Sequence, residues 1–142
     1  MLTEEFKAIY DIFKMNFYAS LCSNSKELNM QEAFSLDIIH MLGEPTILEY
    51  ANYMEISQPN ATYKINQMIE KGYLIKEPCQ EDKRASRLKV TQKFLDIYRE
   101  NDRFIAKTLG DIQNILTEEE NELLIKMLKN IQQQMTKEIK KD

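Results

Sequence analysis

The sequence predicts a mainly α-helical protein that carries one small β-hairpin. Apolar residues recur every three or four positions in six segments, which is the spacing of one helix face. Ser, Thr and Asn stand just before several of these segments, where a side-chain oxygen can accept an unpaired helix N–H. Between residues 73 and 91 the apolar spacing shortens to about two, as in paired strands. With 142 residues, a single domain over 1–142 is expected.

The first helix is expected from about residue 4 to residue 22, behind Thr3 as its N-cap. A second helix should begin after Asn29, because Glu32 follows at the position of a capping box. Gly43 suits the left-handed conformation that ends helices, and Pro45 prevents continuation. The apolar faces of the two helices consist of Phe6, Ile9, Tyr10, Phe13, Phe17 and Leu21, and of Phe34, Ile38, Met41 and Leu42.

Two short helices with a tight joint come next. Thr46 and Glu49 form a capping box for the first, and Ser57 caps the second, with Pro59 in its first turn. Gly72 is expected to end the second helix. The inward face of this helix consists of Ala61, Ile65, Met68 and Ile69. Its outer face carries hydrogen-bonding groups with a single charge among them: Gln58, Asn60, Thr62, Tyr63, Lys64, Asn66 and Gln67.

Residues 73–77 and 87–91 are expected to pair as a β-hairpin. The loop between them lacks Gly, so a two-residue turn is not expected. Thr91 is predicted to cap a long helix, and Thr117 with Glu120 forms a capping box for a last one. The apolar faces of these helices consist of Leu95, Tyr98, Ile105, Leu109 and Ile112, and of Leu124, Leu128, Ile131, Met135 and Ile139.

Two short helices followed at once by a charged hairpin make a winged helix-turn-helix, here over about residues 29–93. Amide and hydroxyl side chains on the second helix match the donors and acceptors of base edges in the major groove. At the hairpin tip, Arg84 can enter a narrow minor groove, whose negative potential attracts guanidinium groups. The predicted contacts with double-stranded DNA are Ser57, Gln58, Asn60, Thr62, Tyr63, Lys64, Asp82, Lys83, Arg84 and Arg87.

The charge distribution is consistent with this prediction, although the chain has a formal net charge of −4. Between Ser57 and Lys93, eight Lys and Arg residues stand against four Asp and Glu, so the remainder is strongly acidic. Attraction to phosphate depends on the local field more than on the total charge. The alternative is a chance cluster of basic residues.

The same residues resemble the MarR family of multiple antibiotic resistance regulators. The resemblance is carried by Leu48-x-x-Ala51, by Ile56-Ser57-Gln58-Pro59, by Glu70-Lys71-Gly72-Tyr73-Leu74-Ile75, and by Asp82-Lys83-Arg84 leading to Leu88-x-Val90-Thr91. It implies a ligand-responsive DNA-binding regulator, a repressor more often than an activator, with Asp82 orienting Arg84. It also implies dimerisation through residues 1–28 and 94–142. The family commonly has Gly where this chain has Phe94.

The apolar faces of the first, fifth and sixth helices also argue for a homodimer, because a compact winged helix leaves them without a partner. A twofold dimer places two recognition helices about one DNA turn apart, which predicts a pseudo-palindromic operator. The alternative function is a helical protein-interaction module with a degenerate winged helix that does not bind DNA.

Aromatic and Met side chains of the second, third and first helices are candidates for a pocket that takes a small apolar or phenolic effector. Residues at helical spacing are also what a plain hydrophobic core requires, so both interpretations stay open. The candidate pocket residues are Phe13, Phe17, Phe34, Met41, Tyr50 and Tyr53.

No enzyme, metal or cofactor is expected from this sequence, which shows no phosphate loop, nucleophile motif or metal-ligand cluster. His40, the single histidine, is interpreted as a helix residue near the interior. Cys22 is interpreted as a buried, inert thiol, with a peroxide-reactive thiol as the alternative, and Cys79 as exposed in the hairpin loop. Two distant cysteines and no membrane-length apolar run predict a cytoplasmic protein.

Overall fold

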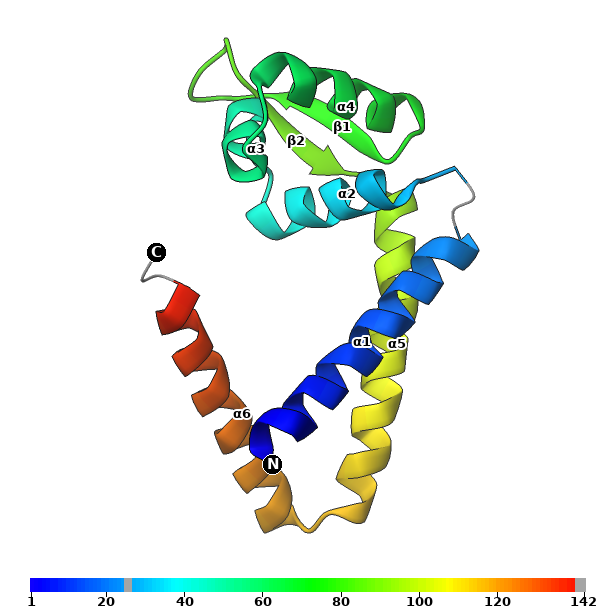
Figure 1. Ribbon diagram of the computed structural model, residues 1–142, viewed down its shortest axis with the longest axis vertical. Coiled ribbons are helices and arrows are strands. Elements are labelled where there is room, and N and C mark those ends of the chain that lie inside the picture. The colour runs from blue at the N-terminus through cyan, green and yellow to red at the C-terminus, as the bar shows by residue number, and fades with distance from the viewer. Residues whose placement is uncertain (25–26, 140–142) are drawn as a thin grey trace. The chain divides into compact units, whose positions relative to one another are not determined.

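The computed structural model describes residues 1–24 and 27–139 and has the predicted fold class, six helices with one antiparallel hairpin (Figure 1). The elements in chain order are α1 (Leu2–Asn24), α2 (Met30–Leu42), α3 (Ile47–Met54), α4 (Gln58–Glu70), β1 (Leu74–Pro78), β2 (Ser86–Val90), α5 (Gln92–Ile115) and α6 (Glu118–Ile139).

Most of the predicted helix caps are present. The Asn29 side chain accepts a hydrogen bond from the backbone N–H of Glu32, and Gly43 ends α2 in the left-handed region at φ 71°. Capping boxes begin α3 at Thr46 and α6 at Thr117, because in each case the helix's Glu also accepts from the cap residue's N–H. Local chemistry therefore sets these helix starts.

Thr91 does not act as the predicted side-chain cap of α5. Its hydroxyl instead donates to the carbonyl of Gly72 at 2.6 Å, and its backbone N–H donates to the carbonyl of Tyr73 at 3.0 Å. Its own carbonyl accepts the first helical hydrogen bonds of α5, from Phe94 and Leu95. The residue thereby joins the start of α5 to the end of α4.

The hairpin pairs Leu74 with Val90 and Pro78 with Ser86, one residue away from the predicted strand limits. A further connection joins β2 to the turn before α3: the N–H of Leu88 donates to the carbonyl of Pro45 at 2.8 Å, and Thr46 forms a bridge with Arg87. The hairpin is thus fixed to the helix-turn-helix by main-chain hydrogen bonds as well as by packing.

The core lies around the hairpin, which has α4 on one side and α2 on the other (Figure 1). Ala61, Ile65 and Met68 of α4 are fully buried, as the sequence predicted. Phe94, at the position where a Gly was to be expected from the resemblance, is also fully buried and packs edge-on against Tyr98 with ring centroids 5.3 Å apart. Its large ring fills the core at the start of α5, where glycine would leave a void.

The chain forms two compact units, Met1–Asn101 and Asp102–Asp142, and the predicted winged-helix core falls within the first. In the second unit α6 has no buried residue in the part of the chain that the structure describes. Large apolar side chains of α6 are instead exposed: Leu123, Ile125, Met127, Leu128, Met135 and Ile139. None of the helices in the described ranges is long and apolar enough to cross a membrane.

Candidate nucleic-acid interface and cavity

The outer face of α4 is accessible along its length. The buried Ala61, Ile65 and Met68 follow the spacing of one helix face, which turns the intervening residues outward. Of the predicted contact residues on this helix and its cap, Ser57, Gln58, Asn60 and Tyr63 are exposed, and Thr62 and Lys64 are partly exposed. The structure therefore leaves all six side chains at least partly accessible, and we call the outward surface of α4 that they share the α4 face.

Hydrogen bonds hold part of the α4 face in place. The Thr62 hydroxyl donates to the carbonyl of Gln58 at 2.9 Å, and the Gln67 amide donates to the Tyr63 hydroxyl at 3.0 Å. The Lys76 ammonium, on β1, donates to the Asn66 amide oxygen at 3.1 Å. This last contact sets the first strand of the hairpin alongside α4.

The hairpin loop is organised by Asp82. Its carboxylate accepts a hydrogen bond from the backbone N–H of Arg84 at 2.9 Å, a turn that Asp and Asn readily form. Asp82, Lys83 and Arg84 are exposed. The resemblance implied that Asp82 orients Arg84, and the contact that the structure shows is to its backbone.

Arg87 differs from the other predicted contact residues. Its guanidinium donates to the carbonyl of Glu44 at 3.1 Å and lies 4.0 Å from the Glu81 carboxylate. Its side chain is 38% exposed. Arg87 thus anchors the hairpin to the end of α2, with part of the guanidinium still accessible.

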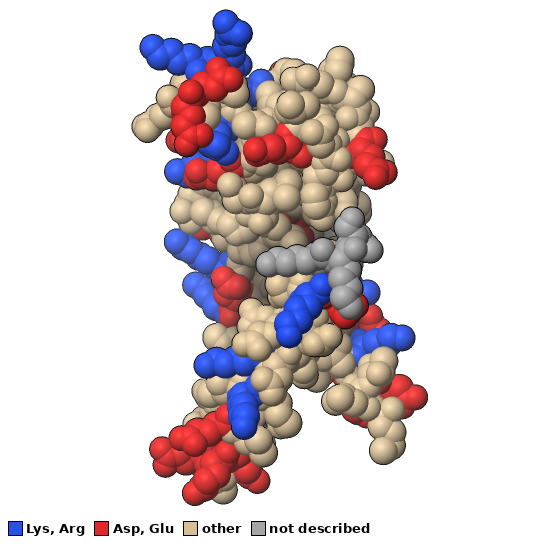
Figure 2. All heavy atoms as spheres, turned by 90° about the vertical axis from the view of Figure 1, so that its left-hand side faces the viewer, with Lys and Arg blue, Asp and Glu red and all other residues tan. Residues whose placement is uncertain are grey.

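Charge is distributed unevenly at this end of the molecule. Figure 2 shows basic side chains projecting at the top, over the hairpin, beside a broad surface with few charged groups. Acidic side chains lie just beneath the basic ones. A duplex that approached the uncharged surface would meet the basic projection at its margin.

Cys79 is buried, at 7% exposure, and the expectation that it is exposed was wrong. The loop folds back over it, since its N–H donates to the carbonyl of Ala85 at 3.0 Å. Hydrogen bonds from the backbone N–H groups of Asp82 and Glu81 hold the pKa of the thiol below its ordinary value, and Arg87 acts in the same direction. The side chain of Cys22 lies outside the described residues.

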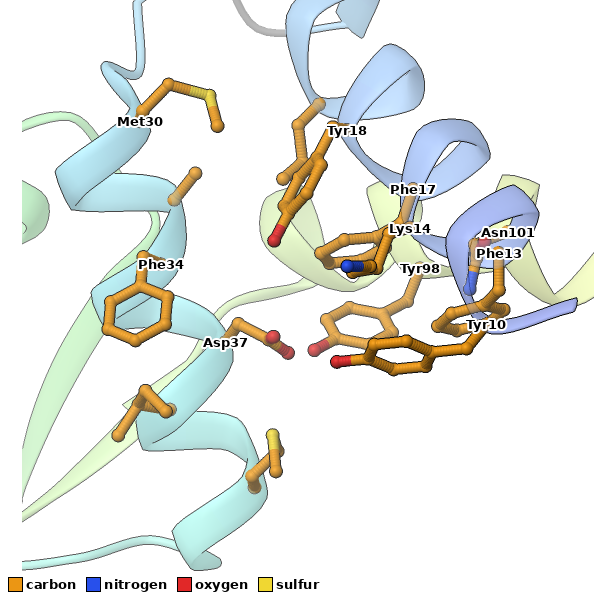
Figure 3. Close-up of a pocket in the computed structure, with 14 residues that line it drawn as sticks. Tyr10, Phe13, Lys14, Phe17, Tyr18, Met30, Phe34, Asp37, Tyr98 and Asn101 are labelled. Atoms are coloured by element: carbon orange, nitrogen blue, oxygen red, sulfur yellow. The ribbon is translucent and has the colours of Figure 1, made fainter. Parts of the chain in front are cut away.

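A cavity of about 490 Å³ lies between α1, α2 and the start of α5 (Figure 3). Phe13, Phe17, Phe34 and Met41 line it, as predicted. Two other predicted pocket residues do not. Tyr50 is fully buried in the core, where its hydroxyl donates to Ser35 at 2.8 Å, and Tyr53 is exposed on α3.

The cavity also contains polar groups that were not expected from the sequence. Lys14 and Asp37 line it, as do the phenol groups of Tyr10, Tyr18 and Tyr98. The Tyr98 hydroxyl is buried and has no hydrogen-bond partner within the described ranges. Burial raises the pKa of the Asp37 carboxyl above its ordinary value, and His40 opposes this effect. The signal for these residues is spacing, because a charged residue interrupts each apolar helix face.

His40 lies on the surface rather than near the interior, and its ring packs on Tyr98 with centroids 4.8 Å apart. No group of three or more His, Cys, Asp or Glu residues that could hold a metal ion occurs among the described residues.

Comparison with known proteins gives a family match and a set of similar folds. Residues 28–86 match the model described as the MarR family. The transcriptional regulator Tm0710 of Thermotoga maritima has 18% identity and a TM-score of 0.70, with 99% of this chain and 98% of that chain covered. FabT of Streptococcus pneumoniae, solved in complex with DNA, has 21% identity and a TM-score of 0.62, with 96% of each chain covered. A MarR family protein of Bacillus stearothermophilus has 18% identity and a TM-score of 0.65, with 95% and 93% covered.

Proposed function

We propose that this protein, whose residues 28–86 match the MarR family model, is a transcriptional regulator of that family that binds double-stranded DNA as a homodimer. The observation that carries the proposal is the accessibility of the α4 face alongside the hairpin, whose tip carries exposed Lys83 and Arg84. The similar FabT structure, which contains DNA, supports it.

In this proposal α4 enters the major groove. The exposed hydroxyl and amide groups of Ser57, Gln58 and Asn60 lie at its N-terminal end, the end that recognition helices direct at base edges. Lys64 contributes attraction to phosphate. Helical packing alone does not require so many uncharged hydrogen-bonding side chains on an exposed face.

The hairpin tip would enter the adjacent minor groove. Arg84 and Lys83 are exposed, and no ion pair to either one is present in the described part of the chain. An exposed guanidinium at the end of a hairpin can insert into a narrow minor groove without losing a buried partner. Arg87 donates to the carbonyl of Glu44, so its main role would be to position the hairpin, and its DNA contact would be limited to phosphate.

A second copy of the chain is the proposed partner for the terminal helices. The exposed apolar residues of α6 form a long surface whose contact with water is unfavourable. On α1, Ile9 and Ile12 are exposed in the same way. A symmetric dimer would bury these faces and carry two α4 faces to a pseudo-palindromic operator.

We also propose that the cavity between α1 and α2 is an effector site. Its volume of about 490 Å³ and aromatic lining suit a small organic molecule. An occupant would contact α1 and α2 together, and a change in their separation would alter the position of the winged helix that α2 begins. A protein that binds genomic DNA must reach it inside the cell, so a cytoplasmic location accompanies the proposal.

The test is fluorescence anisotropy with labelled DNA from upstream of the protein's own gene, at several salt concentrations and with an unrelated duplex as competitor. We expect specific binding that weakens as salt rises. Arg84→Ala should weaken it by about 1–3 kcal/mol, or roughly fivefold to 150-fold. Lys107→Ala on the exposed surface of α5 removes one positive charge elsewhere and should leave affinity near that of the unchanged chain.

A protein that shows no binding beyond that to the unrelated duplex, at any salt concentration, would contradict the proposal. That result would favour the helical protein-interaction module. An Arg84→Ala variant with unchanged affinity at fixed salt would contradict the role of the hairpin tip alone.

A further inference from the structure

Two helix faces of the same spacing form the main walls of the cavity. Each contributes residues at positions i, i+3, i+4, i+7, i+8 and i+11, starting from Tyr10 on α1 and from Met30 on α2. A face of this spacing that served only packing would be apolar throughout. Instead Lys14 interrupts one face and Asp37 interrupts the other.

These two charges are not equivalent. The Lys14 ammonium lies 3.2 Å from the Asp11 carboxylate, so its charge is already balanced on its own helix. Asp37 has no hydrogen bond and no ion pair with any residue that the structure describes. Figure 3 shows its carboxylate extending from α2 into the cavity, opposite the side chains of Tyr10 and Tyr98. Among the described residues that line the cavity, Asp37 is the one carboxylate. Lys14, the cation that lines the same cavity, is already paired with Asp11, and His40 acts on Asp37 without a hydrogen bond or ion pair.

The remaining walls favour a cation with an apolar body. Six aromatic rings line the cavity, two of which, Phe17 and Tyr98, have centroids 5.6 Å apart. Aromatic faces attract cations and exclude water from apolar groups. Tyr10 already shows this behaviour, since the Lys14 ammonium lies 4.5 Å from its ring centroid.

We propose that this cavity binds a lipophilic organic monocation, with Asp37 as its counter-ion and the aromatic rings around its apolar body. The inference deepens the effector site proposed above and rests on it for any effect on DNA. Burial of Asp37 raises the pKa of its carboxyl and so disfavours its charge, and a bound cation would relieve that cost. The buried Tyr98 hydroxyl supplies a further polar contact.

Two ions of the same shape and opposite charge test the proposal directly. Tetraphenylphosphonium and tetraphenylborate each carry four phenyl rings, so the ratio of their affinities reports charge preference. Isothermal titration calorimetry of the full chain without DNA should give at least tenfold tighter binding of tetraphenylphosphonium. Equal affinities, or tighter binding of tetraphenylborate through Lys14, would overturn the proposal.

Two variants test whether Asp37 causes the preference for the cation. Asp37→Asn keeps the size of the side chain and should reduce tetraphenylphosphonium affinity about tenfold, with tetraphenylborate unaffected or bound more tightly. Asp111→Asn, on the surface of α5 and paired with Lys107, removes the same charge outside the cavity and should change neither. Unchanged tetraphenylphosphonium affinity in Asp37→Asn would overturn the proposal.

The affinity ratio of the unchanged chain stands independently of how well any variant folds. DNA binding is measured separately, so a chain that binds its operator without cation preference would overturn this inference and leave the proposed function intact. A chain that prefers the cation but does not bind DNA would support this inference and contradict the proposed function.

Discussion

The Asp82 carboxylate accepts the backbone N–H of Arg84 at 2.9 Å and so fixes the turn that presents the guanidinium at the hairpin tip. Asp82→Ala removes the acceptor and should weaken DNA binding, because the loop must then be ordered on binding. We expect a loss of about 0.5–1.5 kcal/mol, the usual contribution of one such hydrogen bond. The measurement is anisotropy with the operator DNA.

Asp82→Asn is the matched control. Its amide oxygen can accept the same N–H, and it loses the same charge near phosphate as Asp82→Ala. It should therefore bind DNA more tightly than Asp82→Ala. Equal affinities of the two variants would show that the hydrogen bond plays no part in recognition.

A second prediction concerns Lys71, whose ammonium lies 2.8 Å from both carboxylate oxygens of Glu32 and donates to the carbonyl of Glu27 at 2.8 Å. The Glu32 side chain is only 11% exposed. Lys71→Met leaves this largely buried carboxylate without its cation and should lower the free energy of unfolding by about 1–3 kcal/mol. Urea denaturation followed by circular dichroism measures the change.

Lys107→Met provides the comparison, since Lys107 pairs with Asp111 at 3.0 Å on an exposed helix surface. Lys107→Met should lower the free energy of unfolding by no more than about 0.5 kcal/mol. If both variants lose the same amount, burial of Glu32 does not strengthen the Lys71 contact.

The features that the sequence predicted well depend on neighbouring residues. Asn29 with Glu32 and Thr46 with Glu49 form caps within one helical turn, so their spacing alone identifies them. The apolar face of α4 was predicted in the same way, from a regular repeat. The predicted DNA contacts stay a prediction, although the structure places them on an accessible surface.

What the sequence could not give depends on residues far apart in the chain. Arg87 meets the carbonyl of Glu44 across 43 residues, and the burial of Cys79 follows from how the hairpin loop folds back. Tyr50 and Phe13 each belong to an apolar repeat with helical spacing, yet Tyr50 lies in the core and Phe13 lines the cavity. Periodicity identifies the face of a helix, and the packing partner decides what that face meets.

Glu55 gives a third prediction. It ends α3 in the left-handed region at φ 54°, where a side chain is strained and glycine is not. Glu55→Gly should raise the free energy of unfolding by about 0.5–1 kcal/mol, the net of relieved strain and the greater entropy of glycine in the unfolded chain. Asn52→Gly, in the exposed middle of α3, should lower it. A Glu55→Gly variant that unfolds more readily would show that the Glu55 side chain stabilises the turn.

The last prediction follows from the raised pKa of Asp37. Between the ordinary pKa of an Asp and this raised value, the folded chain binds a proton that the unfolded chain does not, so stability rises as pH falls through that window. At neutral pH the folded chain instead bears the cost of a half-buried charge. Asp37→Asn should therefore be more stable than the unchanged chain near pH 7, and this advantage should shrink as pH falls toward 4.

The measurement is the difference in unfolding free energy between the two chains from pH 4 to pH 7.5, since the difference cancels most of the other carboxyl groups. His40, three residues further along α2, also acts on Asp37, so the pair is repeated in a His40→Gln background. The other ionisable groups that line the cavity with Asp37 are Lys14, Tyr10, Tyr18 and Tyr98, and they are the same in both chains. A difference that does not depend on pH would mean that folding leaves the pKa of Asp37 at its ordinary value. A difference that grows as pH falls would mean that Asp37 gains a favourable partner on folding, and its charge would then be balanced without any ligand.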